Sequence, residues 1–331
     1  MTAPIAVVMG TFNGARYIEA QLLSVLNQTL LPQEIIISDD GSTDATIDII
    51  RSVLAREAQA NLALRAIRVE ILTHASHIGM NSNYESALTV SRAELIALCD
   101  QDDIWDSCKL AVLAPLFEGR PDRMLVHSDA QLVAADGHPL GRTHFDDLRI
   151  TTAELSAMNG DRAIDVLLKR NIISGTTSLF RRAVVNRALP IPDPWVPDAW
   201  LAVVASLMGE VCTVEEPLVQ YRQHSANTVG TPGKRYPFMR NMIHWARHSR
   251  GPEFDVRLAH LSFLKSYVEG MPNSTKKHKC LRRIEFENYR ASYPNSRVRR
   301  IVPIIRAVRA GNYQRFAGGS IDVICDLIQP A

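Results

Sequence analysis

Short apolar runs alternate with segments of helical periodicity along the first hundred residues. Residues 5–11 form a β-rich apolar run, and apolar positions recur at helical spacing in residues 17–26. The alternation continues with predicted strands at 34–38, 69–72 and 95–99 and predicted helices at 45–54 and 81–90. Four strands separated by helices predict a mainly parallel, right-handed α/β sheet that is buried on both faces.

The pattern is less regular after residue 109. It predicts a helix there, then a hairpin-like segment at 125–133 with a turn at 135–137, a helix at 164–168 and strands at 177–180 and 218–223. A helix is predicted at 198–208, with Asp198 as its N-cap. The polar stretch 142–162 predicts no element. Residues 236–310 have a mainly helical pattern rich in arginine and lysine.

Composition excludes several classes of protein. Among the 331 residues no apolar run approaches the roughly 18 residues of a membrane-spanning helix. The first residues do not resemble a signal peptide, so we expect a cytoplasmic protein. The five cysteines are scattered, which indicates neither a zinc knuckle nor a disulfide framework.

Charge is distributed unevenly along the chain. Residues 1–230 hold 18 Lys and Arg against 28 Asp and Glu, whereas residues 231–331 hold 19 against 7. This reversal predicts two domains, 1–230 and a basic, mainly helical extension at 231–331. The extension either contacts anionic lipid at the inner face of the membrane or forms a solvated helical cap, with a homodimer surface as one form of the cap. No nucleic-acid-binding module accompanies the charge, so we expect no nucleic acid partner.

Polar residues follow three of the four predicted parallel strands, where ligands bind in sheets of this kind. One cluster contains Asp100, Asp102 and Asp103, whose mutual repulsion a divalent cation or a cationic ligand would relieve. The alternative is a solvated acidic loop in which Asp103 or Asp106 caps the next helix.

The segment 39–44 also has two interpretations. It is either a turn and helix start, capped by Ser42 or Thr43 with Gly41 at the bend, or a base-recognition loop. In the second case a carboxylate accepts the imide N–H of uracil or thymine while Ser42 offers its hydroxyl group.

Five motifs occur in a recognisable order. They are TFNG at 11–14, QLLSVLNQT at 21–29, SDDGSTD at 38–44, CDQDDIW at 99–105 and EPLVQYRQH at 216–224. Together they resemble inverting GT-A glycosyltransferases of the large family-two group, particularly bacterial rhamnosyltransferase-like members, over about residues 3–230. The resemblance implies the GT-A fold, a Rossmann-like, mainly parallel sheet flanked by helices, here with a helical C-terminal extension.

The resemblance also implies an activity. A member of this family moves a sugar, with rhamnose as one candidate, from a dTDP or UDP donor to a glycan or lipid-linked acceptor in bacterial surface polysaccharide synthesis. The anomeric configuration is inverted, and Mg²⁺ or Mn²⁺ is the cofactor. The alternatives are a non-catalytic nucleotide-sugar or glycan-binding module and a metal-dependent phosphohydrolase.

Individual site residues follow from the resemblance, position by position. Asp100 is expected near the ribose and Asp102 at the metal, where His224 completes the metal or diphosphate site. Arg222 offers a planar donor fork that suits a phosphate group. The residues expected around the nucleoside are Thr11, Asn13, Asp39, Asp40 and Ser42.

Asp198 matches the acidic residue that acts as general base in this family. By itself, an Asp at a helix start is more often a plain N-cap. The chain has Pro197 where a His is common and Ala199 where an aromatic residue is common, so the acceptor stays open. Glu215 and Glu216 are the alternative carboxylates for the base.

Overall fold

The computed structural model describes residues 3–224, 247 and 249–330. The chain forms two compact units, one comprising 1–163 with 172–231 and the other 164–171 with 232–331. The expected domain boundary at 230–231 lies outside the described residues. Residues 164–171, which we expected in the first domain, cluster with the second unit.

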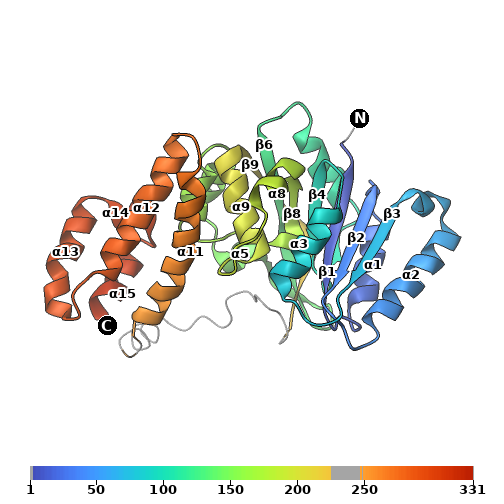
Figure 1. Ribbon diagram of the computed structural model, residues 1–331, viewed down its shortest axis with the longest axis horizontal. Helices are drawn as coiled ribbons and strands as arrows, with labels where there is room; N and C mark the ends of the chain where they lie inside the picture. Colours follow the sequence, from blue (N-terminus) through green and yellow to red (C-terminus); the bar gives the residue numbers. More distant parts are fainter. Residues whose placement is uncertain (1–2, 225–246, 248, 331) are drawn as a thin grey trace. The chain divides into compact units, whose positions relative to one another are not determined.

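The first unit is built on one nine-stranded sheet (Figure 1). The order is β3-β2-β1-β4-β8-β6-β9-β5, and β7 pairs with β6. The first four of these strands are mutually parallel, whereas β8 is antiparallel to both β4 and β6. The strands are β1 (Ile5–Thr11), β2 (Glu34–Asp39), β3 (Arg68–Thr73), β4 (Leu95–Cys99), β5 (Ile104–Trp105), β6 (Arg123–Ala134), β7 (Pro139–Thr143), β8 (Ser178–Arg181) and β9 (Glu210–Gln223).

Helices cover both faces of the sheet. The connections from β1 to β2 and from β2 to β3 each lead to the next strand on the same side of β1. The connection from β3 to β4 leads back across β2 and β1 to their other side. Because all three connections are right-handed, α3 lies on the face of the sheet opposite α1 and α2 (Figure 1). The helices of this unit are α1 (Ile18–Leu26), α2 (Thr46–Ala60), α3 (Met80–Val90), α4 (Lys109–Leu113), α5 (His144–Leu148), α6 (Thr152–Met158), α8 (Arg182–Ala188) and α9 (Pro197–Met208), while α7 (Ala163–Leu167) falls almost entirely in the second unit. The 3₁₀ segments are Leu62–Ala66, Ala114–Phe117 and Gly175–Thr177.

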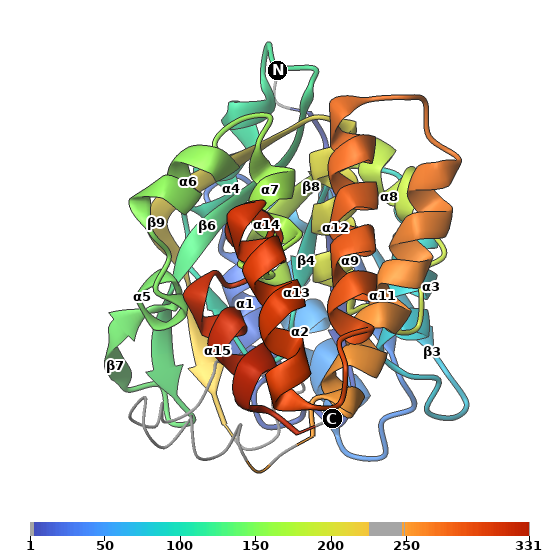
Figure 2. The ribbon, with the colours of Figure 1, turned by 90° about the vertical axis from the view of Figure 1, so that its left-hand side faces the viewer.

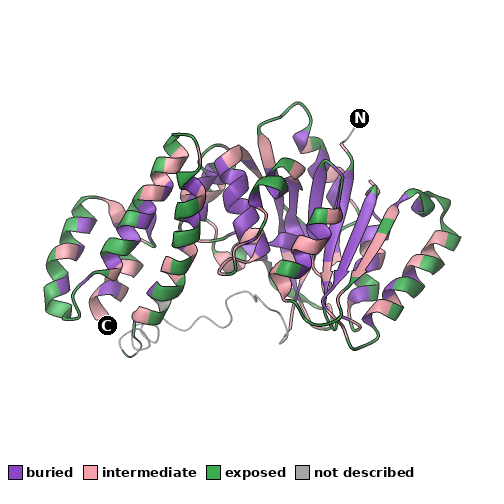
Figure 3. Cartoon of the chain, viewed as in Figure 1, coloured by how far each residue is buried: buried purple, intermediate pink, exposed green. Residues whose placement is uncertain are grey.

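The central strands β2 and β4 are buried along their whole length, and β1 is buried except at Gly10 (Figure 3). The apolar residues of β1, β2 and β4 are at most 2% exposed, and α1 buries Ile18, Leu22 and Val25 against them. This explains why the strands have continuous apolar runs rather than an alternating pattern. The predicted fold class is confirmed.

The polar stretch 142–162 contains two short helices that the hydrophobic pattern did not predict. Thr143 and Asp146 form a capping box at the start of α5, and Thr151 and Glu154 form another at the start of α6. In each box the threonine side chain and the acidic side chain satisfy backbone N–H groups that a helix start leaves without partners. The sequence signal for these two helices is therefore the pair of capping boxes at their first residues, and not a periodic pattern of apolar residues.

The second unit is helical, as predicted for the part that the structure describes. Its elements are α11 (Gly251–Glu269), α12 (Thr275–Ala291), α13 (Arg297–Arg309), α14 (Asn312–Phe316) and α15 (Ser320–Ile328). Helix α11 packs on α12, and α13 packs on α14 and α15 (Figure 2). Across the described residues, no helix is both long and apolar enough to cross a membrane.

Candidate active site

The carboxyl ends of β1, β2 and β4 lie side by side at one edge of the sheet. Thr11 is in register with Asp39, and Met9 is in register with Cys99, so the three polar clusters predicted from the sequence begin at the same level. Strands β2 and β3 are added to one side of β1 and β4 to the other, so the order in which strands join the sheet reverses between β1 and β4. Such a reversal is the usual ligand position in a sheet of this type.

Asp39 organises the first cluster. Its carboxylate accepts hydrogen bonds from the Thr11 hydroxyl at 2.8 Å, the Ser42 backbone N–H at 2.8 Å and the Ser42 hydroxyl at 2.6 Å. Helix α2 begins only at Thr46, whose backbone N–H donates to Asp44. The turn is therefore not a plain helix start capped by Ser42 or Thr43, and that interpretation is wrong.

Asn13 and Gln101 join the strand ends to one another. The Asn13 N–H donates to the Ser42 hydroxyl at 2.8 Å, and its side-chain oxygen accepts from the Thr43 N–H at 2.9 Å. The Gln101 amide contacts both backbone groups of Phe12, at 2.9 and 3.0 Å. A Cβ at Gly14 would lie 2.1 Å from the Gln101 side-chain oxygen, so a larger residue here would displace the Gln101 amide from its place beside Phe12.

Asp40 is buried and binds the loop before α3. Its carboxylate accepts from the Ile78 N–H at 2.6 Å and the Gly79 N–H at 3.1 Å, and it lies 2.8 Å from the His77 imidazole. The Phe12 ring packs at a centroid distance of 4.7 Å from the same His77 and is 41% exposed. Asp40 thus holds the loop that carries His77 beside the exposed Phe12 ring.

The acidic residues after β4 do not form a solvated loop. Asp103 is fully buried and accepts from the Arg222 N–H at 2.9 Å. Asp100 accepts from the Tyr84 hydroxyl at 2.7 Å, and burial, followed by the charge of Asp102, raises the pKa of Asp100 to about 7. The interpretation as a solvated loop is therefore wrong. Asp106 accepts from the Cys108 N–H at 2.9 Å, but Cys108 itself occupies the N-cap of α4, so neither Asp103 nor Asp106 caps that helix.

Asp102 and His224 meet because β5 pairs with β9. Ile104 is in register with Gln220, which brings the acidic loop next to the end of β9. The Asp102 carboxylate lies 2.8 Å from His224 Nε2, and their side chains are 15% and 11% exposed. The His224 ring stacks on Tyr17 with a centroid distance of 5.0 Å.

The donor set of this pair suits a divalent cation that is shared with a substrate. In the described part of the chain no three His, Cys, Asp or Glu side chains are grouped to hold a metal. A carboxylate oxygen and an imidazole nitrogen are ligands that Mn²⁺ accepts, and ions of this kind are often held by one or two protein groups plus substrate phosphates. The residues present therefore fit a cation bound jointly with a diphosphate.

Arg222 is engaged with the protein itself. Its guanidinium donates to the Asp102 carbonyl at 2.7 Å and to the Ala135 carbonyl at 3.1 Å, and it lies 4.9 Å from the Tyr17 ring centroid. The side chain is buried, with the residue 5% exposed. These contacts fix the backbone at Asp102, which is a function that the sequence did not indicate. The predicted contact of Arg222 with a phosphate stays a prediction.

Asp198 is not the N-cap of its helix. Helix α9 begins at Pro197, and Val196 occupies the cap position. The Asp198 carboxylate accepts from the Ala199 N–H at 2.7 Å and the Gly175 N–H at 3.1 Å. Burial raises the pKa of Asp198 to about 6, although the two N–H groups oppose the shift.

Asp198 and Asp100 interact electrostatically, since the charge of Asp198 contributes to the raised pKa of Asp100. Geometry also places Asp198 near the end of β4, because a Cβ at Gly175 would lie 3.4 Å from Asp198 Cβ and 3.5 Å from Leu98 Cδ1. By contrast, Glu215 and Glu216 are exposed on β9, in a bulge between the partners of Ser128 and Asp129 on β6.

The 3₁₀ segment Gly175–Thr177 is fixed by hydrogen bonds from two residues that were not predicted as site residues from the sequence. Lys109 is fully buried and donates to the Thr176 carbonyl at 2.6 Å, while the Trp105 indole N–H donates to the Thr176 hydroxyl at 3.2 Å. The Lys109 ammonium lies 3.1 Å from the Trp105 ring centroid, and burial lowers its pKa to about 7. Because Gly175 donates to Asp198, these anchors also fix the surroundings of that carboxylate.

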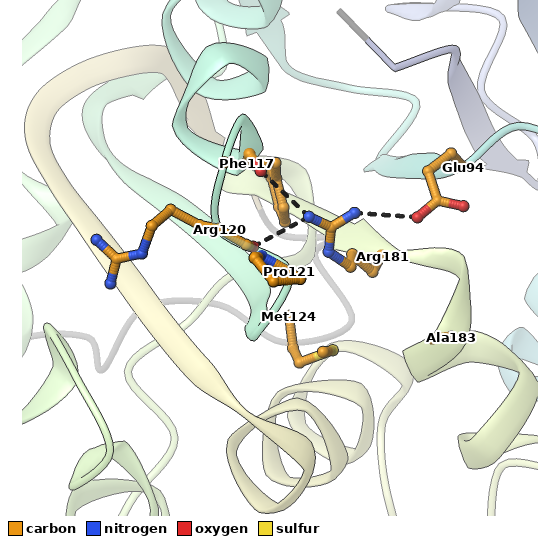
Figure 4. A pocket seen from close by; sticks show the side chains of 8 residues that line it. Glu94, Phe117, Arg120, Pro121, Met124, Arg181 and Ala183 are labelled. Carbon is orange, nitrogen blue, oxygen red and sulfur yellow. Dashed lines mark hydrogen bonds and ion pairs between the residues drawn. The ribbon is translucent and has the colours of Figure 1, made fainter.

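A hollow among the described residues lies elsewhere. It has a volume of about 500 Å³ and is lined by Glu94, Phe117 and Arg181, among others (Figure 4). Glu94 precedes β4 and Arg181 ends the antiparallel β8, so the hollow lies at the opposite end of the strands from Asp100. Arg181 is paired with Glu94 at 3.0 Å and donates to the Phe117 carbonyl at 3.2 Å. This hollow is therefore not part of the candidate site.

Known proteins of similar sequence include two bacterial relatives. An uncharacterized protein of Mycobacterium tuberculosis is 28% identical over 226 residues, which are 67% of this chain and 59% of that protein. The chain thus spans less than two thirds of the length of this relative. The dTDP-rhamnosyl transferase RfbG of Shigella flexneri is 26% identical over 235 residues, which are 67% of this chain and 73% of that protein.

Two solved structures share the fold. The structure of S. aureus TarS in complex with UDP-GlcNAc has a TM-score of 0.56 at 17% identity and covers 86% of this chain and 72% of that chain. Mannosyltransferase PcManGT from Pyrobaculum calidifontis, in complex with GDP-Man and Mn²⁺, has a TM-score of 0.53 at 17% identity and covers 94% and 76%. At this identity the two likenesses concern the fold alone.

The family model for glycosyl transferase family 2 matches residues 6–188. This segment runs from β1 to the end of α8 and includes the Asp39 network, the acidic loop after β4 and the Gly175 segment. Since the match extends over more than half of the 331 residues, this chain belongs to glycosyl transferase family 2.

Proposed function

We propose that this chain is an inverting, metal-dependent glycosyltransferase that moves a sugar from a nucleotide diphosphate donor to a hydroxyl group of a glycan or lipid-linked acceptor. The observation that carries the proposal is the convergence of three features at one edge of the sheet. These are the Asp39 network, the pair Asp102 and His224, and the half-buried Asp198 carboxyl group, whose pKa is raised. A binding module would need the first two but has no use for a half-buried carboxyl group with a pKa of about 6.

The nucleoside is proposed to bind at the ends of β1 and β2. Asp39 and Asn13 are held rigidly by Ser42 and Thr43, so this part of the site is formed before the donor arrives. Asp40 contributes indirectly through the loop that carries His77. Likeness to the Shigella protein supports dTDP-rhamnose as donor, whereas the UDP-GlcNAc complex of TarS supports a UDP-sugar.

Asp102 and His224 would hold a divalent cation together with the donor diphosphate. Such an ion stabilises the negative charge that develops on the leaving diphosphate. The Mn²⁺ in the PcManGT complex supports this role. Arg222 keeps the Asp102 backbone in position and adds positive charge beneath the loop.

Asp198 is proposed to accept the proton of the acceptor hydroxyl as its oxygen attacks the anomeric carbon. The bond from that carbon to the diphosphate breaks on the opposite face, so the configuration inverts. A carboxylate with a pKa of about 6 is ionised at neutral pH and is a stronger base than one at 3.8. The hydrogen bonds from Gly175 and Ala199 aim it without neutralising it.

Location and pathway are part of the same proposal. A cytoplasmic enzyme with a nucleotide-sugar donor and a lipid-linked acceptor fits surface polysaccharide synthesis. The alternative, a binding module without turnover, shares the donor site and differs only in the acceptor half.

A thermal-shift panel tests the donor half of the proposal. The purified chain is heated with dTDP-rhamnose, UDP-GlcNAc, UDP-glucose or GDP-mannose, each with and without Mn²⁺. We expect one donor class to raise the melting temperature only when Mn²⁺ is present, since ligands stabilise the state they bind. Asp39→Ala should lose the shift, and the exposed-site control Asp193→Ala should keep it. A shift that is independent of Mn²⁺ would contradict the metal assignment.

A further inference from the structure

Helix α13 of the second unit carries an exposed apolar face. Its large apolar residues recur at i, i+3, i+4, i+7 and i+10, the spacing of a single helical face, and they are between 43% and 74% exposed. The residues are Val298, Ile301, Val302, Ile305 and Val308. Five of the fourteen exposed large apolar side chains in the described parts of the chain therefore lie on this one helix.

The helix packs on its own unit by the opposite side. There Arg300, Ile304 and Ala307 are buried, and Arg300 donates to the Gln329 carbonyl at 2.6 Å and the Pro294 carbonyl at 2.6 Å. The exposed apolar face is therefore not needed to attach α13 to α14 and α15. A contiguous apolar helix face that is exposed to water is unusual on the surface of a protein and marks a site of interaction.

Positive charge borders the apolar face on one side and ends it, since Arg309 follows Val302 by seven residues and lies on the same side of the helix. Residues 288–321 contain seven arginines and no acidic residue. Arg299, Arg306 and Arg309 are exposed, and none of the ion pairs found among the described residues involves them. An apolar stripe bordered by arginines is the pattern of a helix that lies in the interface of an anionic membrane.

The lysine-rich start of α12 belongs to the same basic extension, but much of its charge is engaged within the unit. Lys279 pairs with Asp165 at 2.8 Å, Lys277 donates to the Glu269 and Met271 carbonyls, and Arg283 is buried beside Glu287. Arg282 of α12 stays exposed, so exposed positive charge lies on both helices, and on α13 it adjoins the apolar face.

We propose that α13 is a membrane-interfacial helix, whose apolar face inserts among the acyl chains of an anionic bilayer while its arginines contact the lipid phosphates. Charge complementarity selects this occupant. A second copy of α13 on the same face would bring two sets of arginines together with no acidic residue from 288–321 to compensate them. The inference is independent of which donor sugar the first unit uses.

Vesicle flotation of the full chain tests the proposal. We expect binding to phosphatidylcholine vesicles that contain about one third phosphatidylglycerol, little binding to phosphatidylcholine alone, and weaker binding as salt rises. The triple change R299Q/R306Q/R309Q should weaken binding by about a hundredfold, because each arginine at an anionic surface contributes about a factor of five. Its control, R51Q/R92Q/R187Q, removes the same charge from exposed positions of the first unit and should bind nearly as wild type.

A second pair of variants tests whether the apolar face of α13 is needed for vesicle binding. I301S/V302S/I305S should lose vesicle binding, and V256S/F263S, which removes exposed apolar side chains of α11, should keep it. Val302→Trp adds a fluorescent reporter whose emission should shift to the blue and be quenched by brominated lipid, so the test does not depend on loss of function.

Three outcomes would overturn the proposal. They are equal binding to neutral vesicles, equal losses in both arginine variants, and an indole emission in Val302→Trp that brominated lipid does not quench. A concentration-dependent dimer in sedimentation velocity that I301S/V302S/I305S abolishes would assign the face to self-association instead. Donor-induced thermal shifts, measured on the same variants, should be unchanged and show that the first unit is intact.

Discussion

Replacing Asp198 by Asn should make the protein more stable and much less active. The folded chain holds the pKa of Asp198 at about 6, whereas an unfolded Asp titrates near 3.8. This difference corresponds to about 3 kcal/mol by which folding favours the protonated carboxyl group. The native carboxylate therefore costs stability at neutral pH, and a neutral Asn removes that cost.

The sign of the pH dependence follows from the raised pKa. Stability associated with the protonated Asp198 is fully present below pH 3.8 and is lost as the pH rises to about 6. We expect urea unfolding to show Asp198→Asn more stable than wild type by about 1–3 kcal/mol at pH 8, with the difference disappearing near pH 4. The upper limit is reduced because Asn can accept only part of the hydrogen bonding from Gly175 and Ala199.

Activity should change in the opposite direction. Turnover of Asp198→Asn should fall by about a hundredfold or more, while the KM for the donor changes little, because a general base acts in the transition state. In the wild type, kcat/KM for the acceptor should fall about tenfold between pH 7 and pH 5 as the carboxylate is protonated.

Asp193→Asn is the matched control, since Asp193 is exposed in the loop before α9 and should alter neither property. If Asp198→Asn lost stability at pH 8 and kept a rate within a few-fold of wild type, Asp198 would be a structural residue. The base would then have to be sought at Glu215 or Glu216.

Three further changes test other parts of the site. Asp102→Asn should abolish most turnover and make donor binding insensitive to Mn²⁺ in thermal-shift assays, with an unchanged melting temperature of the free protein; retained metal dependence would exclude Asp102 as a ligand. Lys109→Met removes the hydrogen bond to the Thr176 carbonyl and should lower kcat about tenfold with the donor KM unchanged; an altered donor KM instead would contradict a role through Asp198. Thr11→Val removes the hydroxyl that contacts Asp39 and should weaken donor binding about five- to tenfold in titration calorimetry, whereas Thr43→Val, at a 3.4 Å contact, should have a smaller effect.

The parallel half of the fold could be predicted from the sequence because its signals are local. Each of β1, β2 and β4 is buried on both faces and appears as a continuous apolar run, and the helices between them have clear periodicity. The polar turns at Thr11, Asp39 and Asp100 follow directly, since the ends of parallel strands share one edge.

The remaining site contacts depend on pairing between distant segments. Asp102 meets His224 only because β5 pairs with β9, and Lys109 reaches Thr176 across 67 positions of the chain. Such contacts leave no periodic pattern in the sequence. For Asp198, the sequence correctly indicated a nearby helix start. Proline is common at the first position of a helix, and α9 begins at Pro197, so Asp198 lies in the first turn and not at the N-cap.

The central claim, sugar transfer at the sheet edge, is tested most directly by product analysis with the donor that the thermal-shift panel selects. The chain is incubated with that donor, Mn²⁺ and a lipid-linked or glycan acceptor, and nucleoside diphosphate and glycosylated acceptor are quantified together, with the anomeric configuration read by NMR. We predict equal amounts of both products, an inverted anomeric centre, and loss of both in Asp198→Asn. Donor binding without acceptor-dependent release of nucleoside diphosphate, or release of inorganic phosphate in the absence of acceptor, would contradict the claim.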